Sequence, residues 1–148
     1  MDRKKRHWLV VLVLCFMLLS ACGDQSSSSN FFETQEVSGS LDPPEAFAEF
    51  NNPYAGDQAA ALEGEILYQA NCSSCHGFSG EGDGTASAGL EPKPQNLAER
   101  QSELSDAYLF WRISDGGLME PFNSLMPAWR GLLAEEQIWQ VITYLRTF

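Results

Sequence analysis

The distribution of apolar and polar residues along the chain predicts three amphipathic helices and no strand. The last predicted helix, Ala134 to Phe148, is the clearest, because its apolar residues recur at the three- and four-residue spacing of one helix face. These residues are Ile138, Val141, Ile142 and Leu145, and Trp139 widens the stripe. Acidic residues in the first turn and Arg146 in the last turn complement the helix dipole.

A second pattern predicts a helix from Ala59 to Asn71, with Asp57 as its N-cap. Its expected apolar face consists of Leu62, Ile66, Leu67 and Ala70. Gly64, in the middle of this helix, costs about 1 kcal/mol relative to alanine, which indicates that another helix crosses closely at this point.

The third predicted helix begins at Asp106, after Ser105 as N-cap, and ends near Ser114, before two glycines. Its bulky residues are Tyr108, Leu109, Trp111 and Ile113. The intervening stretches, which are rich in glycine and proline, are expected to be loops: 77–89, 92–97 and 121–127. The fold class is therefore predicted to be all-α.

The N-terminus has the pattern of an export signal over residues 1–21. Basic residues precede an apolar run from Trp8 to Leu19, which is shorter than a typical membrane-spanning helix. The following Leu19-Ser20-Ala21-Cys22 resembles the lipobox of bacterial lipoproteins. This resemblance implies cleavage before Cys22, lipid on that residue, and a location on the outer face of a bacterial membrane. The alternative is an uncleaved N-terminal anchor.

Residues 22–56 are predicted to be a flexible tether, and residues 57–148 a folded domain. The tether contains a serine-rich stretch, prolines, and acidic residues without any basic one. A competing interpretation applies to Phe31-Phe32 and to the stretch from Ala46 to Phe50, because they are too apolar for a pure spacer. They are expected either to pack on the domain or to dock onto a partner.

The chain of 148 residues has a formal net charge of −11. Removal of the signal takes away four of the nine basic residues and one of the 20 acidic ones, so the charge becomes −14. This charge excludes nucleic acid as a partner and favours protein partners with basic docking surfaces.

The motif Cys72-Ser73-Ser74-Cys75-His76 carries the main chemical signal, because Cys-x-x-Cys-His is the attachment pattern of a c-type haem. Its two thiols can form thioethers with the porphyrin, and the histidine supplies an axial nitrogen to the iron. A zinc site would need further ligands that the mature chain lacks. A thioredoxin-type pair would need a βαβ setting, which the pattern does not predict.

The second axial ligand is expected to be a methionine. Removal of the signal leaves His76 as the only histidine and Met119 and Met126 as the only methionines. Met126 is favoured, because the adjacent Pro127 stiffens the backbone. The alternatives are Met119 and an open or unusual sixth position.

Residues 57–148 resemble a class I cytochrome c domain. The resemblance rests on the attachment motif, the segment Pro92–Leu97, the end of the middle helix at Trp111–Gly116, the methionine motif Met126-Pro127-Ala128-Trp129, and the last helix. It implies a small all-α fold, with about three to four helices around one covalent haem. It also implies that Gly64 and Tyr144 pack where the first and last helices cross, and that the carbonyl of Pro94 accepts a hydrogen bond from the axial imidazole. One departure is Ala134, which stands where many relatives begin the last helix with Ser or Thr.

The resemblance implies an electron carrier rather than an enzyme, with His76 and Met126 on the iron. Arg112, Arg130 and Trp129 are candidates to neutralise or bond the haem propionates. The first hypothesis is a tethered shuttle that exchanges single electrons between redox partners. The second is a fixed monohaem subunit of a larger respiratory or photosynthetic complex, of the alternative complex III type. The third is a five-coordinate haem for gas sensing or peroxide chemistry, against which the absence of a distal histidine argues.

Overall fold

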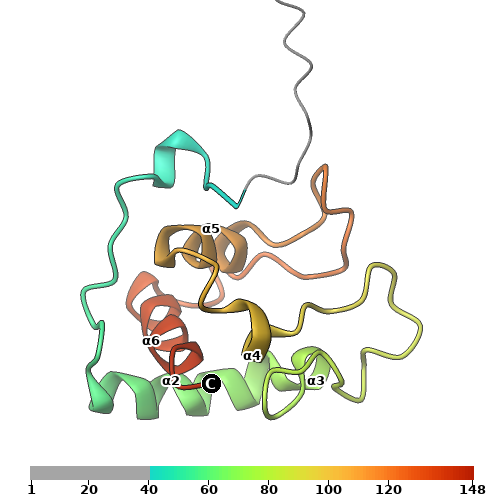
Figure 1. The fold of residues 1–148 in the computed structure, drawn as a ribbon, viewed down its shortest axis with the longest axis horizontal. Coiled ribbons are helices and arrows are strands. Elements are labelled where there is room, and N and C mark those ends of the chain that lie inside the picture. The colour runs from blue at the N-terminus through green and yellow to red at the C-terminus, as the bar shows by residue number, and fades with distance from the viewer. Residues whose placement is uncertain (1–40) are drawn as a thin grey trace, which may run out of the picture. The chain divides into compact units, whose positions relative to one another are not determined.

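Three helices frame the domain in a computed structural model of the chain, which describes residues 41–148 (Figure 1). They are α2 (Gln58–Asn71), α5 (Asp106–Asp115) and α6 (Glu135–Leu145). Three short elements accompany them: the 3-10 helix η1 (Glu45–Phe47), α3 (Ser73–His76) and α4 (Leu97–Arg100). The described part of the chain contains no named strand, and the predicted all-α class is confirmed. Its helices include none that is long and apolar enough to cross a membrane. The predicted signal, Cys22 and the Phe31-Phe32 pair lie outside the described residues.

The helix starts follow the predicted caps. The Asp57 side chain accepts from the backbone N–H groups of Ala59 and Ala60, and Ser105 Oγ accepts from the N–H of Tyr108 at 3.0 Å. Ala134 offers no side-chain cap to α6, but the Gln137 side chain accepts from the Ala134 N–H at 2.9 Å. This contact satisfies one backbone donor at a terminus where the sequence leads us to expect a weaker cap. Helix α6 ends at Leu145, earlier than the predicted Phe148.

The close crossing of α2 and α6 at Gly64 is confirmed. A Cβ atom at Gly64 would lie 2.0 Å from the Gln140 carbonyl oxygen and 3.0 Å from Tyr144 Cβ. One turn further along α2, Tyr68 is buried and packs its ring against Tyr144, with the ring centroids 5.4 Å apart. Figure 1 shows α6 crossing α2, with α5 on the other side of α6.

The predicted apolar face of α2 is wrong in part. Leu62 and Ile66 are 63% and 64% exposed, whereas Ala60, Gly64 and Tyr68 form the buried side. The reason is steric. The backbones approach so closely at Gly64 that only small side chains fit at the crossing, and the branched aliphatic residues therefore face away from α6.

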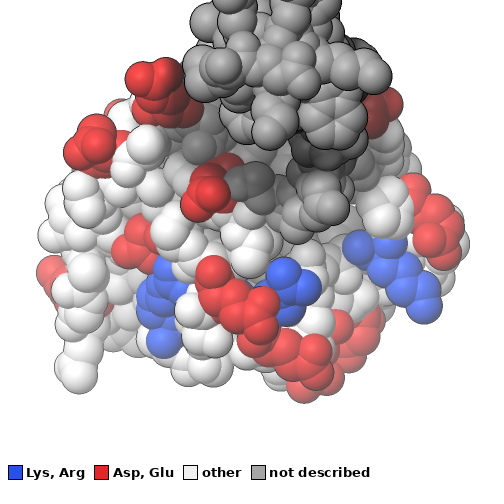
Figure 2. Space-filling model, turned by 45° about the horizontal axis from the view of Figure 1, so that its top comes forward, with Lys and Arg blue, Asp and Glu red and all other residues white. Residues whose placement is uncertain are grey.

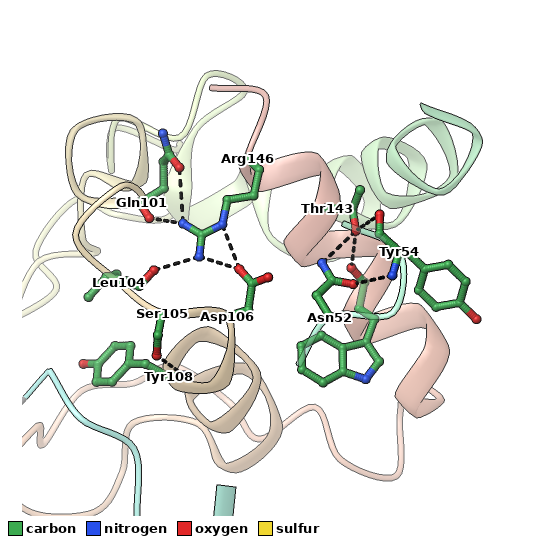
Figure 3. Close-up of polar contacts among 10 residues, drawn as sticks. Asn52, Tyr54, Gln101, Leu104, Ser105, Asp106, Tyr108, Thr143 and Arg146 are labelled. Carbon is green, nitrogen blue, oxygen red and sulfur yellow. Dashed lines mark hydrogen bonds and ion pairs between the residues drawn. The ribbon is translucent and has the colours of Figure 1, made fainter. Parts of the chain in front are cut away.

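The segment before α2 packs on the domain, which confirms that alternative for Phe47 and Phe50. The Phe50 ring lies 5.2 Å from the Phe110 ring, and Phe110 stacks on Trp139 at 4.3 Å. Asn52 Nδ2 donates to Thr143 Oγ1 at 3.0 Å and fixes the same segment to α6 (Figure 3). The last part of the stretch assigned to the tether is thus held on the aromatic core.

Arg146, at the end of α6, ties this helix to the start of α5 (Figure 3). Its Nε donates to the Asp106 carboxylate at 2.8 Å, and its Nη2 donates to the Leu104 carbonyl at 2.7 Å. Its Nη1 donates to the Gln101 carbonyl. The guanidinium therefore satisfies backbone acceptors next to α5 as well as one carboxylate.

Candidate haem-attachment site

The attachment motif forms a single helical turn at the C-terminal end of α2. Cys72 closes α2, and α3 follows at once, with the N–H of His76 donating to the Cys72 carbonyl at 2.9 Å. Residues three and four positions apart in such a turn lie on one side of it, so Cys72, Cys75 and His76 are brought together. Both cysteines are free and half-buried.

The His76 imidazole has one ring nitrogen engaged. Its Nδ1 lies 3.1 Å from the Gln95 carbonyl oxygen, an acceptor, so Nδ1 carries the proton and donates. In that tautomer Nε2 keeps its lone pair for a metal, and the carbonyl fixes the ring orientation. Burial lowers the pKa of His76, which further favours the neutral form that ligates iron.

The carbonyl that accepts this hydrogen bond belongs to Gln95, so the role expected for Pro94 is a misassignment by one residue. The Pro94 carbonyl oxygen faces the glycine-rich loop instead, where a Cβ atom at Gly82 would lie 2.4 Å from it. Successive backbone carbonyls in an extended segment point in different directions, so only one of the two can face the ring. The presence of Pro94 near the haem otherwise stays a prediction.

The glycine-rich loop folds back onto the attachment turn. The N–H groups of Gly82 and Gly84 donate to the carbonyls of His76 and Cys75 at 2.8 and 3.2 Å. A Cβ atom at Gly84 would lie 2.3 Å from the Ser74 carbonyl oxygen, so a larger residue would separate the two segments. Beneath them, the Tyr68 hydroxyl donates to the Gly77 carbonyl at 2.8 Å. The loop therefore holds the cysteines and the histidine in place from one side.

The chemistry of these donors fits a c-type haem. Burial, followed by the nearby Cys75, raises the pKa of the Cys72 thiol to about 12, so the group is a neutral thiol at physiological pH. A thioether forms from such an S–H group and a vinyl carbon. Two half-buried thiols beside an imidazole with a free Nε2 are the groups that would supply the covalent attachment and one axial bond to such a haem.

The segment that carries Met126 is attached to the end of α5. The Gly117 N–H donates to the Met126 carbonyl at 2.9 Å, and the Trp129 N–H donates to the Ile113 carbonyl at 3.0 Å. Gly116 has φ +72, and a Cβ atom there would lie 2.7 Å from the Met126 carbonyl oxygen. Met126 and Trp129 are half-buried against the core. The backbone around Met126 is therefore held on both sides of the residue.

The other methionine has a different environment. Met119 Sδ lies 3.6 Å from Arg112 Nη1, which donates to it. Arg112 also places its guanidinium carbon 3.6 Å from the centroid of the Phe122 ring. Arg112, Arg130 and Trp129 as partners of the propionates stay predictions, as does iron ligation by Met126.

The sequence interpretation missed two participants at this site. Gln95 acts through its backbone carbonyl, which every residue has, so no side-chain signal marks it. Phe122 was assigned only to a loop, because an aromatic residue ten positions after an arginine gives no indication that the two side chains meet.

A protein-family model described as cytochrome c oxidase, cbb3-type, subunit III matches residues 59–145. The matched region begins in α2, contains the attachment turn and the Met126 segment, and ends with α6.

Proposed function

The chain belongs to the cbb3-type family of class I cytochrome c domains, which carry a covalent c-type haem and transfer electrons, and from this premise we propose that it is a membrane-tethered electron carrier with His76 and Met126 as axial ligands. When bound, the haem supplies one-electron chemistry, because its iron alternates between the ferrous and ferric states. The chain's own residues would attach the group and orient its ligands.

The hydrogen bond from His76 Nδ1 to the Gln95 carbonyl is the observation that carries this proposal. A histidine fixed in the Nδ1–H tautomer directs Nε2 away from its partner and increases the basicity of the ligand. On the other side, a thioether from Met126 favours the reduced iron and raises the reduction potential. The donor contact from Arg112 to Met119 Sδ supports Met126 over Met119.

The proposed carrier is exported and held on the outer face of a bacterial membrane by lipid on Cys22, following the lipobox-like sequence that ends there. Acidic side chains are spread over the face of the domain in Figure 2, with basic side chains between them. Redox partners with basic docking surfaces are expected to associate faster at low ionic strength than at high ionic strength.

The near-infrared absorption spectrum of the oxidised holoprotein tests the ligand assignment. Sulfur ligation of ferric haem gives a weak band in this region, which we expect in the wild type and in Met119→Ala but not in Met126→Ala. A wild-type spectrum without the band, together with ready binding of carbon monoxide to the reduced protein, would refute six-coordinate electron transfer. Those results would favour the sensing or peroxide alternative.

The second candidate function, a fixed subunit of a larger complex, is favoured by the outer side of α2. Leu62 and Ile66 are four residues apart, share one side of the helix and are both largely exposed. Glu63 and Glu65, also exposed, flank them. A helix that carries apolar residues on two sides is typically covered by other protein surfaces on both sides. The negative charges of Glu63 and Glu65 favour a partner whose apolar surface is bordered by basic residues, rather than a second copy of this acidic chain.

Purification of the full-length protein from its native membranes separates the two candidates. A fixed subunit is expected to purify with the same proteins in constant ratio, and Leu62→Gln with Ile66→Gln is expected to abolish that association. Leu132→Gln, which changes an exposed leucine outside α2, serves as the control. Elution of the wild-type protein alone would favour the shuttle.

A further inference from the structure

Arg112 in the last turn of α5 makes several contacts with one loop. Its Nη1 donates to the Gly116 carbonyl at 2.5 Å and to Met119 Sδ at 3.6 Å. The planar guanidinium also lies over the Phe122 ring, with Cζ 3.6 Å from the ring centroid. These contacts all fall within residues 116–122, and the arginine side chain is half-buried among them.

The geometry of these contacts is specific to arginine. A guanidinium presents several N–H donors in one plane and can stack on an aromatic face at the same time, whereas an ammonium is a compact, strongly hydrated charge. Burial lowers the pKa of Arg112, but the group remains charged at any physiological pH. A half-buried cation is stabilised by such partners, so the loop and the arginine order each other.

The loop held by Arg112 leads directly to Met126. Backbone hydrogen bonds tie Gly117 in this loop to the residues that follow it, from the Ser124 N–H to the Gly117 carbonyl at 2.7 Å and from the Gly117 N–H to the Met126 carbonyl at 2.9 Å. Gly117 is also close to the arginine, since a Cβ atom there would lie 3.2 Å from Arg112 Nη2. A displacement of the loop at Gly116 or Gly117 would therefore be transmitted to the backbone of Met126.

We propose that Arg112 is a positioning residue that fixes the loop of residues 116–122 and thereby keeps the Met126 thioether on the iron. This inference rests on the proposed ligation by Met126. Without Arg112, the loop loses a charged donor and an aromatic contact, and the sulfur competes less well with external ligands. The residue thus controls how readily the sixth position opens, although it makes no contact of its own with the iron.

The test is a titration of the ferric holoprotein with imidazole, followed through loss of the near-infrared band. Arg112→Lys retains the positive charge but removes the planar donors and the stacking on Phe122. We expect its midpoint imidazole concentration to fall roughly tenfold or more, the ratio that corresponds to loss of one hydrogen bond to a charged group. The reduction potential is expected to fall as well, and the retained charge excludes a simple electrostatic cause.

Two further variants keep the result interpretable. Arg100→Lys makes the same substitution at an arginine of α4 that pairs with Glu103 at 2.8 Å, and it is expected to titrate like the wild type. Phe122→Leu keeps apolar volume, removes the ring face, and is expected to lower the midpoint in the same direction as Arg112→Lys. An unchanged midpoint in Phe122→Leu overturns the proposal even if Arg112→Lys yields no holoprotein.

The failure of this inference is distinguishable from failure of the proposed function. A wild-type protein that shows the band, with an Arg112→Lys variant that titrates like Arg100→Lys, overturns the positioning role and leaves ligation by Met126 standing. A wild-type protein without the band overturns both.

Discussion

Replacing Gly64 with alanine tests whether the backbone approach of α2 and α6 is as close as the structure shows. In an unconstrained helix this change would stabilise the protein by about 1 kcal/mol, because alanine is the better helix former. At the crossing, however, the added Cβ would lie 2.0 Å from the Gln140 carbonyl oxygen and 2.5 Å from its carbonyl carbon. Both atoms belong to the backbone of α6, so no side-chain rotation can relieve the clash.

The expected cost follows from that geometry. The helices must separate by more than about 1 Å to restore van der Waals contact, and overpacking of this kind costs typically 1–3 kcal/mol. The separation also loosens the buried contact between Tyr68 and Tyr144, so we expect a cost in the upper part of that range. This cost exceeds the gain in helix propensity. The predicted net destabilisation is about 1–2 kcal/mol, or a fall in Tm of roughly 10 °C for a domain of this size.

Thermal unfolding of the holoprotein, followed by circular dichroism, measures this effect. Glu65→Ala, at the exposed neighbouring position of α2, is the control, and its stability is expected to stay within about 0.5 kcal/mol of the wild type. A Gly64→Ala variant that is more stable than the wild type would show that helix propensity governs this position and that the close crossing is not maintained.

Three other predictions concern the caps and the core. Ser105→Ala removes the side-chain acceptor for the Tyr108 N–H and is expected to destabilise the domain by about 1 kcal/mol in urea unfolding; no change would show that the cap does not contribute. Phe50→Ala removes a ring from the aromatic cluster with Phe110 and is expected to cost roughly 2 kcal/mol, with faster proteolysis before α2; an unaltered cleavage rate would contradict packing of that segment. Burial raises the pKa of Tyr68 above its ordinary value of 10.0, so the unfolded chain releases this proton first and stability should fall as pH rises beyond 10. Tyr68→Phe should flatten this alkaline loss, and an identical pH profile would refute the assignment.

The sequence alone indicates the chemistry of this protein and where two of its main helices begin. The attachment motif identifies two thiols and an axial histidine, because no other common use of those residues fits the rest of the chain. Asp57 and Ser105 mark helix starts, since a cap acts on backbone groups only two or three residues away. Gly64 indicates the helix crossing, because a glycine in mid-helix needs a compensating contact.

Other features were decided only by the tertiary structure. The burial of Ala60 rather than Leu62 on α2 follows from the distance between two helix backbones, and residue hydrophobicity does not encode that distance. The partner of His76 is a backbone carbonyl, so the path of the chain alone selects Gln95 over Pro94. Arg112 meets Phe122 because the intervening loop turns back on the helix end, and such a contact leaves no periodic pattern in the sequence. Local signals thus determine which elements form, and long-range packing determines which atoms they bring together.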